Sequence, residues 1–382
     1  MVRSLQKPKI ALMSYSMDNR PAKGTALYTR KLIENLLDDD RYEFCLVHYD
    51  KVDDPLYKKA REIIMPEIHL PFATRFMRQV LFFWKYRNEG FDIIHWFQPR
   101  LYPFFWLAPA RKLVVTAHGA GDITASSYFV FSRIVFNYIM RNFNKHIDAC
   151  IAVSHFAMEE IVENYKIAKE KVFVTYNGGG EEYKPIDKKV SKEIMSRSYS
   201  VSNPYILDVS RFVPHKNVLN LVRAYIIVKE KYHIEHDLVI VGFKDRSFKE
   251  VSDLAQMSAY STSIHFIDYV ETNDLNALYS GADLFAFPSL NEGFGLPVIE
   301  SMASGTPVIT SDATSMPEIG GDAVLLVDPS NPNDIAEKIY KVLSDAALND
   351  SLTKKGLERA KNFTWKQTSE ATKKIYDEVL RI

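Results

Sequence analysis

Short runs of apolar residues alternate with longer amphipathic stretches along most of the chain. Such runs are typical of buried strands, and apolar positions that repeat every three or four residues are typical of helices. Because consecutive parallel strands are joined by helices, the alternation predicts an α/β fold with parallel sheets. The strands predicted in the first half are Lys9–Met13, Phe44–His48, Asp92–Trp96, Leu113–Ala117, Ala149–Val153 and Lys171–Thr175. Ala26–Leu37 is a predicted helix, and Ser154 is the predicted N-cap of another.

The pattern breaks between Pro185 and Pro204, where the sequence is polar and rich in serine and lysine. We expect an interdomain connection there, with room for a short helix. Afterwards the alternation resumes. The predicted strands are Tyr205–Val209, Leu238–Val241, Ile264–Ile267, Leu284–Phe287 and Pro307–Thr310. The predicted helices are Val218–Lys231, Asp274–Ser280, Pro297–Ser304 and Asn333–Leu343.

The two halves predict two successive doubly wound domains, because 382 residues exceed the size of one typical domain. We expect an N-terminal domain at 1–185, a linker at 186–204 and a C-terminal domain at 205–364. A final helix at 365–382 is expected to return to the first domain. Ligands of such sheets bind beyond the carboxyl ends of the strands, so the cleft between the domains is the first place to look for a site.

Composition narrows the class of protein. Lys+Arg and Asp+Glu balance at 48 each, which argues against a nucleic-acid-binding protein. The two cysteines, Cys45 and Cys150, are predicted to be buried thiols without a disulfide or zinc site, which favours a reducing, cytoplasmic compartment. The apolar N-terminal run is a predicted strand and not a signal peptide. No apolar segment is long enough to span a membrane, since prolines interrupt the stretch at 101–110.

The stretch from Leu290 to Ile309, "LNEGFGLPVIESMASGTPVI", holds the chemistry. Its glycines, with Pro297 at a predicted helix start and Gly305 at the end, form a helix entrance of the kind that binds phosphate. Two glutamates, Glu292 and Glu300, flank that entrance, and carboxylates are suited to accept hydrogen bonds from hydroxyl groups. A ligand with phosphate in its middle and hydroxyls at both ends fits this arrangement. We therefore predict a nucleotide-sugar site.

A second loop supplies positive charge. "SRFVPHKN" follows the strand Tyr205–Val209, at the same carboxyl edge as the glutamate loop. Its Arg211 and Lys216 can converge on a diphosphate and neutralise it as a leaving group without a metal. Two solvated loop cations are the alternative interpretation.

These motifs resemble those of the retaining glycosyltransferases of the GT4 family, which have the GT-B fold. The second half also carries "ADLFAFPS", "ATSMPEIGGDAVLLVDP" and "FTWKQTSEATKKIYDEVL", and the first half agrees more loosely through "VVTAHGAGD" and "DACIAVSHFA". The resemblance implies GT-B architecture, with two Rossmann-like domains facing across a cleft. It also implies transfer of a hexose-type sugar from a nucleotide diphosphate sugar to a glycan or lipid-linked acceptor, in cell-surface polysaccharide or glycolipid assembly.

The resemblance also implies a role for each site residue. Glu300 would hold the ribose, Arg211 and Lys216 the diphosphate, and Glu292 the donor sugar. The remaining residues implied in donor binding are Gly293, Phe294, Gly295 and Leu296 at the helix entrance, Gly24 in the first domain, and Gly242, Tyr269 and Val270 around the base. His118 would face the transferred sugar, although lone histidines after strands are usually structural. The implied mechanism is retaining, without a metal, a cofactor or a protein nucleophile, so that positioning and charge stabilisation supply the catalysis.

The chain departs from the family pattern at three places. Gly119 follows His118 where an aspartate is common, the glycine pair of the first βα loop is reduced to Gly24, and Asn177 is followed by "GGGEE". These departures affect the acceptor more than the donor site. A glycosidase using Glu292 and Glu300, a nucleotide-sugar epimerase and a non-catalytic nucleotide-sugar-binding protein remain as alternatives. A dinucleotide oxidoreductase fits worst, because no G-x-G-x-x-G opens the first βα unit.

The segment Phe72–Arg87 interleaves cations with large apolar side chains. Packing inside the first domain, with the cations reaching outward, is the favoured interpretation. A peripheral contact with the inner face of the membrane, near a lipid-linked acceptor, is the alternative.

Overall fold

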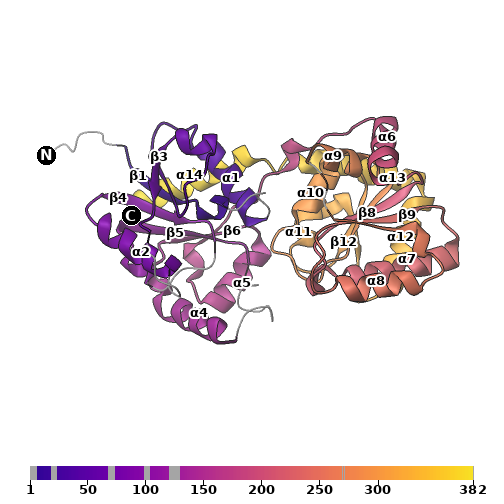
Figure 1. Cartoon of the computed structure of the whole chain (residues 1–382), viewed down its shortest axis with the longest axis horizontal. Helices are drawn as coiled ribbons and strands as arrows, with labels where there is room; N and C mark the ends of the chain where they lie inside the picture. The colour runs from indigo at the N-terminus through magenta and orange to yellow at the C-terminus, as the bar shows by residue number, and fades with distance from the viewer. Residues whose placement is uncertain are drawn as a thin grey trace. The chain divides into compact units, whose positions relative to one another are not determined.

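The computed structural model describes residues 7–18, 24–67, 74–98, 104–119, 130–268, 270 and 272–381. It divides into two compact units, of which the first comprises Met1–Asn177 and Trp365–Ile382 and the second Gly178–Thr364 (Figure 1). Each unit is an α/β sandwich around its own parallel sheet. None of the helices in the described ranges combines the length and apolarity needed to cross a membrane.

The first unit holds a seven-stranded sheet in the order β3-β2-β1-β4-β5-β6-β7, with every pair parallel. Its strands are β1 (Lys9–Met13), β2 (Glu43–His48), β3 (Arg61–Ile64), β4 (Phe91–Trp96), β5 (Ala110–Ala117), β6 (Ala149–Ala152) and β7 (Val172–Val174). The sequence predicted six of these strands but not β3. That strand lies at the sheet edge and its first two residues are exposed, so it lacks an apolar run.

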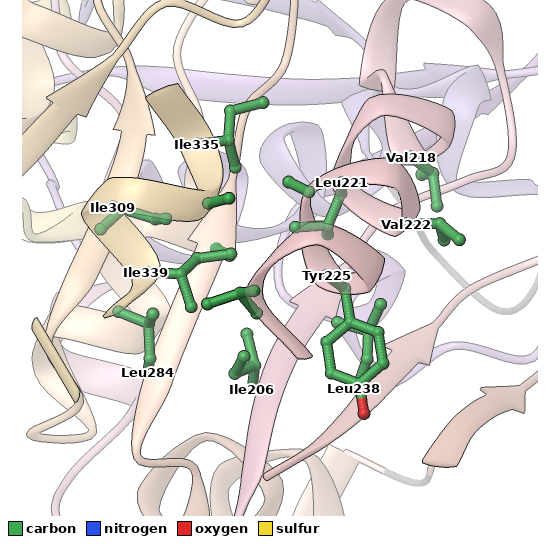
Figure 2. Close-up of a cluster of buried hydrophobic side chains, with 14 of the residues drawn as sticks. Ile206, Val218, Leu221, Val222, Tyr225, Leu238, Leu284, Ile309, Ile335 and Ile339 are labelled. Atoms are coloured by element: carbon green, nitrogen blue, oxygen red, sulfur yellow. The ribbon is translucent and has the colours of Figure 1, made fainter. Parts of the chain in front are cut away.

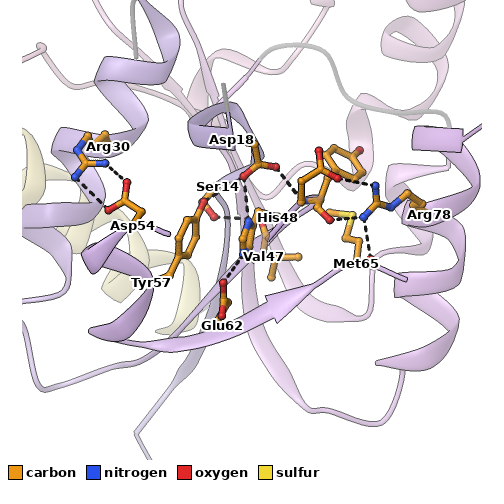
Figure 3. A network of polar contacts seen from close by, with 12 residues as sticks. Ser14, Asp18, Arg30, Val47, His48, Asp54, Tyr57, Glu62, Met65 and Arg78 are labelled. Atoms are coloured by element: carbon orange, nitrogen blue, oxygen red, sulfur yellow. Dashed lines mark hydrogen bonds and ion pairs between the residues drawn. The ribbon is translucent and has the colours of Figure 1, made fainter. Parts of the chain in front are cut away.

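A polar network holds β3 in place where apolar contacts are few (Figure 3). His48, at the end of β2, is fully buried and stacks on Tyr57 at a ring distance of 3.9 Å. Its Nδ1 lies 3.0 Å from Asp18 and its Nε2 lies 3.0 Å from Glu62 of β3. Arg78 reinforces the same edge by donating to the backbone carbonyl of Met65, just beyond β3. This edge is therefore fixed by buried hydrogen bonds, which a periodicity argument does not detect.

Helices of the first unit are α1 (Thr25–Leu36), α2 (Thr74–Lys85), α4 (Val130–Phe143), α5 (His155–Tyr165) and α14 (Trp365–Arg381). The C-terminal α14 belongs to this unit, and its Trp365 and Tyr376 are buried in the same core as Leu32 of α1. The Tyr376 hydroxyl lies 2.5 Å from Nδ1 of the buried His95. Ser154 caps α5 as predicted, because its Oγ accepts a 3.0 Å hydrogen bond from the amide of Ala157. Both cysteines are buried free thiols, also as predicted.

The second unit holds a six-stranded parallel sheet in the order β10-β9-β8-β11-β12-β13. The strands are β8 (Tyr205–Val209), β9 (Asp237–Val241), β10 (Ile264–Ile267), β11 (Leu284–Phe287), β12 (Val308–Ser311) and β13 (Val324–Val327). Since chain order reverses between β8 and β11, their carboxyl ends flank the switch point at which such sheets bind ligands.

Helices lie on both sides of this sheet (Figure 1). The helices of the second unit are α6 (Lys188–Tyr199), α7 (Val218–Tyr232), α8 (Phe248–Met257), α9 (Thr272–Gly281), α10 (Leu296–Ala303), α11 (Met316–Gly320), α12 (Pro332–Ser344) and α13 (Ala346–Ala360). The face of α7 that carries Val218, Leu221, Val222 and Tyr225 packs on strand residues and on α12, as its spacing predicted (Figure 2).

The predicted linker at 186–204 is instead part of the second unit, where α6 packs on α9. The Tyr199 hydroxyl donates a 2.9 Å hydrogen bond to Asp274, and the Ser280 hydroxyl accepts one from the amide of Ile186. Because α6 buries only Ser191 and Met195, its sequence is polar enough to resemble a linker. The boundary between the units lies at Asn177–Gly178, before the predicted boundary at 185. Gly180 packs against backbone of the second unit, where a Cβ would approach the carbonyl oxygen of Ala360 to 2.2 Å.

Candidate functional site

The start of α10 has the geometry that the sequence predicted. Gly295 is the N-cap with φ of 100°, and a Cβ there would meet Cε of Met316 at 2.3 Å. Pro297 lies in the first turn, and Gly305 follows the helix with φ of 78° and donates to the carbonyl oxygen of Met302. The positive φ favours glycine at position 295, and a Cβ there would also require the end of the Met316 side chain to shift. The entrance is therefore built for close approach of a ligand to the backbone at the start of α10, where Pro297 has no amide hydrogen and the Val298 amide already donates to the Gly295 carbonyl oxygen.

Glu292 precedes this entrance and is held from three sides. Its Oε1 accepts a 2.8 Å hydrogen bond from the Ser289 hydroxyl and lies 2.5 Å from Nζ of Lys216. Its backbone is fixed by Thr314 and by Ser315, whose hydroxyl donates to the Glu292 carbonyl oxygen at 2.9 Å. Lys216 also lies over the ring of Phe287, 5.0 Å from its centre. The structure thus brings together two of the predicted donor-binding residues.

Hydrogen bonds to backbone carbonyl oxygens explain how Lys216 reaches Glu292. Asn217 adopts φ of 60°, and its Nδ2 donates to the carbonyl oxygens of Pro288 and Pro329 at 2.9 and 2.7 Å. The His215 carbonyl oxygen accepts from the amide of Leu290 at 2.7 Å. These bonds fasten the loop after β8 to the loop after β11. Burial and the neighbouring Lys216 lower the pKa of His215, which favours its neutral form.

Arg211 has a different partner. Its exposed guanidinium lies 2.6 Å from Asp245, in the loop after β9, so the structure does not place it on Glu292. Gly242 has a packing reason, because a Cβ there would come within 1.8 Å of the carbonyl oxygen of Ser210. Val270 is buried, and Tyr269 lies outside the described residues.

Glu300 lies on α10 and accepts a 2.7 Å hydrogen bond from the Tyr279 hydroxyl. Burial raises the pKa of its carboxyl to about 7, although hydrogen bonds from Tyr279 and Tyr183 stabilise the ionised form, and the negative charge of Glu182 adds to the rise. The two tyrosine rings meet edge to face, 5.6 Å apart. The sequence interpretation missed this tyrosine pair, and the signal available was Tyr183 beside the unusual "GGGEE" segment.

Asp208 is a second residue that the interpretation missed. It is 1% exposed, its Oδ2 accepts a 2.5 Å hydrogen bond from the Ser210 hydroxyl, and its Oδ1 has no hydrogen-bond partner within the described part of the chain. Burial raises its pKa to about 7, the positive charge of Lys216 opposes this shift, and the negative charge of Glu292 adds to it. The available signal was an acidic residue inside the apolar run Tyr205–Val209, directly before the Arg/Lys loop.

His118 and Gly24 lie in the first unit. Nε2 of His118 is 3.3 Å from the carbonyl oxygen of Phe97, and its ring meets the Tyr28 ring edge to face at 4.7 Å. Burial lowers the pKa of His118 to about 4, so the imidazole is neutral at pH 7. Gly24 caps α1 with φ of 54°, and a Cβ there would meet no atom within 4 Å. Backbone conformation, not crowding, therefore favours glycine at this position.

Two family models match the chain. Residues 22–178 match Glycosyltransferase Family 4, and residues 191–359 match Glycosyl transferases group 1. The two ranges cover most of the first and of the second unit. The second range includes the α10 entrance, both glutamates and the Arg/Lys loop.

Similar sequences include mannosyltransferases. The chain is 28% identical over 279 residues to O-antigen chain mannosyltransferase B of Escherichia coli, which covers 72% of each protein. It is 30% identical over 225 residues to the serotype-specific mannosyltransferase WbdA of Escherichia coli. The matched stretch covers 58% of this chain and 28% of that relative. An uncharacterized glycosyltransferase of Methanocaldococcus jannaschii is 25% identical over 93% of this chain and 95% of its own length.

Solved structures resemble the whole chain. HepE from Anabaena, solved in complex with UDP and glucose, matches with a TM-score of 0.76 at 17% identity, covering 97% of this chain and 100% of HepE. A sucrose-phosphate synthase from Thermosynechococcus elongatus matches with a TM-score of 0.75 at 22% identity, covering 98% of this chain and 99% of its own. At these identities the likeness establishes the fold alone. It confirms the predicted GT-B architecture of two Rossmann-like domains.

Proposed function

Because the chain belongs to the group 1 glycosyltransferases of the GT4 family, we propose that it transfers a hexose of the mannosyl type from a nucleotide diphosphate sugar to a hydroxyl group of a growing glycan. The observation that carries this proposal is the arrangement of Lys216, Glu292 and Glu300 around the start of α10. Similarity to an O-antigen chain mannosyltransferase and to a serotype-specific mannosyltransferase supports the choice of sugar and of a polysaccharide acceptor.

The donor would bind along the carboxyl edge of the second sheet. Its diphosphate would accept hydrogen bonds from Lys216 and from backbone amides at the start of α10. Arg211 is close enough to affect His215 electrostatically, and it would join the diphosphate by leaving Asp245. Glu292 would accept hydrogen bonds from hydroxyls of the sugar, and Glu300 from hydroxyls of the ribose. Each acidic group thereby contacts hydroxyls, while the helix start and the cations contact phosphate.

The transfer would follow a retaining course on one face of the sugar. The acceptor oxygen forms a bond to the anomeric carbon while the bond from that carbon to the diphosphate breaks. The acceptor proton passes to the departing phosphate oxygen, so the products are a glycoside and a nucleoside diphosphate. The cations and helix amides stabilise the charge that develops on the leaving group. Neither a protein nucleophile nor a bound metal is part of this proposal.

Contact with a membrane remains a separate proposal. In α2, Phe82 and Phe83 are buried in the first unit, which agrees with the favoured interpretation that this segment packs inside. Trp84 is 65% exposed and carries Arg87 over its ring at 5.0 Å, so these two residues and Lys85 would form any contact. Flotation with anionic liposomes, compared between the unaltered protein and Trp84→Ala, tests it. Equal flotation of both proteins would remove α2 from the proposal.

The proposed function is tested first by binding and then by product analysis. Thermal-shift titration with UDP-, GDP-, ADP- and TDP-sugars should show saturable stabilisation by one class, which Glu300→Ala abolishes. Incubation with that donor and mannosyl oligosaccharides should release nucleoside diphosphate and extend the oligosaccharide, with the anomeric configuration retained by NMR. Turnover of the donor without any acceptor would favour the epimerase, and cleavage of simple glycosides would favour the glycosidase. Stabilisation without any turnover would favour the non-catalytic binding protein.

A further inference from the structure

Asp208 occupies a central position beneath the donor site. It lies near the end of β8, and residue 211 already belongs to the loop that carries the site's cations. Four groups act on its carboxyl from three segments of the second unit. The Ser210 hydroxyl donates a hydrogen bond to it, and Lys216 in the same loop, Glu292 after β11 and Tyr279 on α9 interact with it electrostatically. Tyr279 in turn donates to Glu300, so Asp208 neighbours the supports of both glutamates.

The surroundings of this carboxyl favour its neutral form. The side chain is 1% exposed, and among the residues that the structure describes only Ser210 makes a hydrogen bond to it. An ionised carboxylate in such a site would have an unpartnered oxygen and a strongly unfavourable desolvation energy. Lys216 is a cation that acts on this carboxyl, but its Nζ is already paired with Glu292 at 2.5 Å. A neutral acid therefore fits this site better than an anion does.

The charge on Asp208 then decides the net charge beneath the donor. With Asp208 neutral, Lys216 and Glu292 cancel, and the donor diphosphate meets the helix amides of α10 without a repelling charge. With Asp208 ionised, the same cluster carries one net negative charge, and its repulsion acts through a poorly solvated interior. The hydrogen bond to Ser210 also fixes the start of the cation loop, the loop after β8 that carries Arg211 and Lys216. Gly242 packs there on the Ser210 carbonyl oxygen.

We propose that Asp208 is a positioning residue of the donor site, whose buried neutral carboxyl anchors the cation loop and whose ionisation weakens diphosphate binding. The proposal rests on the proposed function, because it assumes that the donor diphosphate lies over Lys216 and the start of α10. It concerns a residue that contacts neither the sugar nor the acceptor.

The test uses inorganic pyrophosphate as a probe that is independent of base and sugar. Its dissociation constant is measured by calorimetry from pH 5.5 to 8.5 for the full chain, for Asp208→Asn and for Ser210→Ala. Asparagine has the shape of the neutral acid and cannot ionise, so Asp208→Asn should match the unaltered protein at low pH. Above neutral pH it should bind pyrophosphate about tenfold more tightly, the order expected for one charge acting over several ångströms. The ratio of the two constants at each pH cancels the titration of the probe and of Glu300.

Ser210→Ala tests independently in which direction the pH dependence of pyrophosphate affinity shifts. The Ser210 hydroxyl stabilises the ionised carboxylate, so its removal should move the loss of affinity, measured relative to Asp208→Asn, to higher pH. A purely structural role of Asp208 would instead give a ratio that is constant across pH, and that result would overturn the proposal. A shift to lower pH in Ser210→Ala would overturn it as well.

Lys216→Met separates this proposal from the proposed function. If Lys216→Met weakens pyrophosphate binding but the Asp208→Asn ratio is flat, the donor site stands and the role of Asp208 fails. If pyrophosphate does not bind, or binds equally well to Lys216→Met, the diphosphate site itself is wrong and both proposals fail. The exposed pair Lys249–Asp253 on α8, 2.8 Å apart, provides matched control variants, Lys249→Met and Asp253→Asn, which should leave every constant unchanged.

Discussion

Nζ of Lys216 lies 2.5 Å from Oε1 of Glu292, so the residue assigned to the diphosphate and the residue assigned to the sugar form an ion pair with each other. Both side chains are mostly buried, and Ser289 shares the same carboxylate oxygen. For Lys216 to contact phosphate and Glu292 to contact sugar hydroxyls at full strength, this pair has to loosen when the donor binds. The pair therefore links the two halves of the proposed donor site.

Removing either partner should affect two ligands differently. Lys216→Met keeps the stem over Phe287 but loses the charge, so affinity for nucleoside diphosphate and for nucleotide sugar should both fall by about 10- to 100-fold, the range for a charged hydrogen bond. Glu292→Gln frees the ammonium, so nucleoside diphosphate should bind as tightly as before or tighter, while kcat/KM for the nucleotide sugar falls. Calorimetry and initial rates measure these quantities. A parallel loss of both affinities in Glu292→Gln would contradict the division of roles.

Donor binding should also depend on pH through Glu300. Its pKa of about 7 means that the carboxylate, the stronger acceptor for ribose hydroxyls, forms as the pH rises through neutrality. Affinity for the nucleotide sugar should therefore rise from pH 6 to pH 8 in Asp208→Asn, where the proposed opposing effect of Asp208 is removed. Tyr279→Phe removes a hydrogen bond that stabilises the carboxylate, so the midpoint should move to higher pH. Glu300→Gln in the same background should flatten the profile, and an unchanged midpoint in Tyr279→Phe would argue that Glu300 does not control binding.

The fold followed from the sequence at most places where burial produced apolar runs, although the apolar edge strand β13 was not among the predicted strands. Strands β8 and β11 have the predicted bounds, and the apolar face of α7 contains the predicted residues. The reason is that the side chains of all three elements are buried in the core of the second unit. The edge strand β3 was not predicted, and α6 was expected only as a short helix inside a linker, for the opposite reason. One is held by polar contacts from His48, and the other buries only two residues.

The candidate site could be predicted only in its local parts. The α10 entrance depends on Gly295 and Pro297, whose conformational effects are visible in a single sequence. The pairing of Lys216 with Glu292 and the hydrogen bond from Tyr279 to Glu300 join separate segments of the chain, and the burial of Asp208 depends on how those segments pack. Such partners are set by the tertiary structure, so the sequence supplied the residue types without their contacts. Whether Gly242 and Val270 hold the nucleotide base stays a prediction.

Substitution of Gly295 should separate steric from conformational effects. In Gly295→Ala the new Cβ would overlap Met316 and would force alanine to adopt φ near 100°, at a cost of about 1 to 3 kcal/mol. The transition of the second unit should shift accordingly in chemical denaturation, and nucleotide-sugar affinity should fall because the entrance is displaced. The double variant Gly295→Ala/Met316→Ala removes the overlap and leaves the backbone strain. Full recovery in the double variant would show that crowding alone requires glycine here.

The buried carboxyl of Asp208 predicts how stability changes with pH. Its pKa is about 7 in the folded protein against 3.8 for the unperturbed group, so between these values the unfolded chain has lost the proton that the folded chain keeps. The contribution of this group is therefore fully present below about pH 4, falls as the pH rises and is lost above about pH 7. A shift of this size corresponds to about 4 kcal/mol, at about 1.4 kcal/mol for each pKa unit.

Asp208→Asn should remove this dependence, because the amide stays neutral at every pH. The free energy of unfolding of the second unit, measured by denaturant titration from pH 4 to pH 8.5, should fall less steeply in the variant than in the unaltered protein. The variant should therefore gain relative stability as the pH rises, with most of the gain between pH 4 and pH 7. Asp253→Asn, at an exposed site on α8, serves as the control and should show no such trend. Parallel curves for Asp208→Asn and the unaltered protein would mean that Asp208 is ionised in the folded state, which its unpartnered Oδ1 argues against.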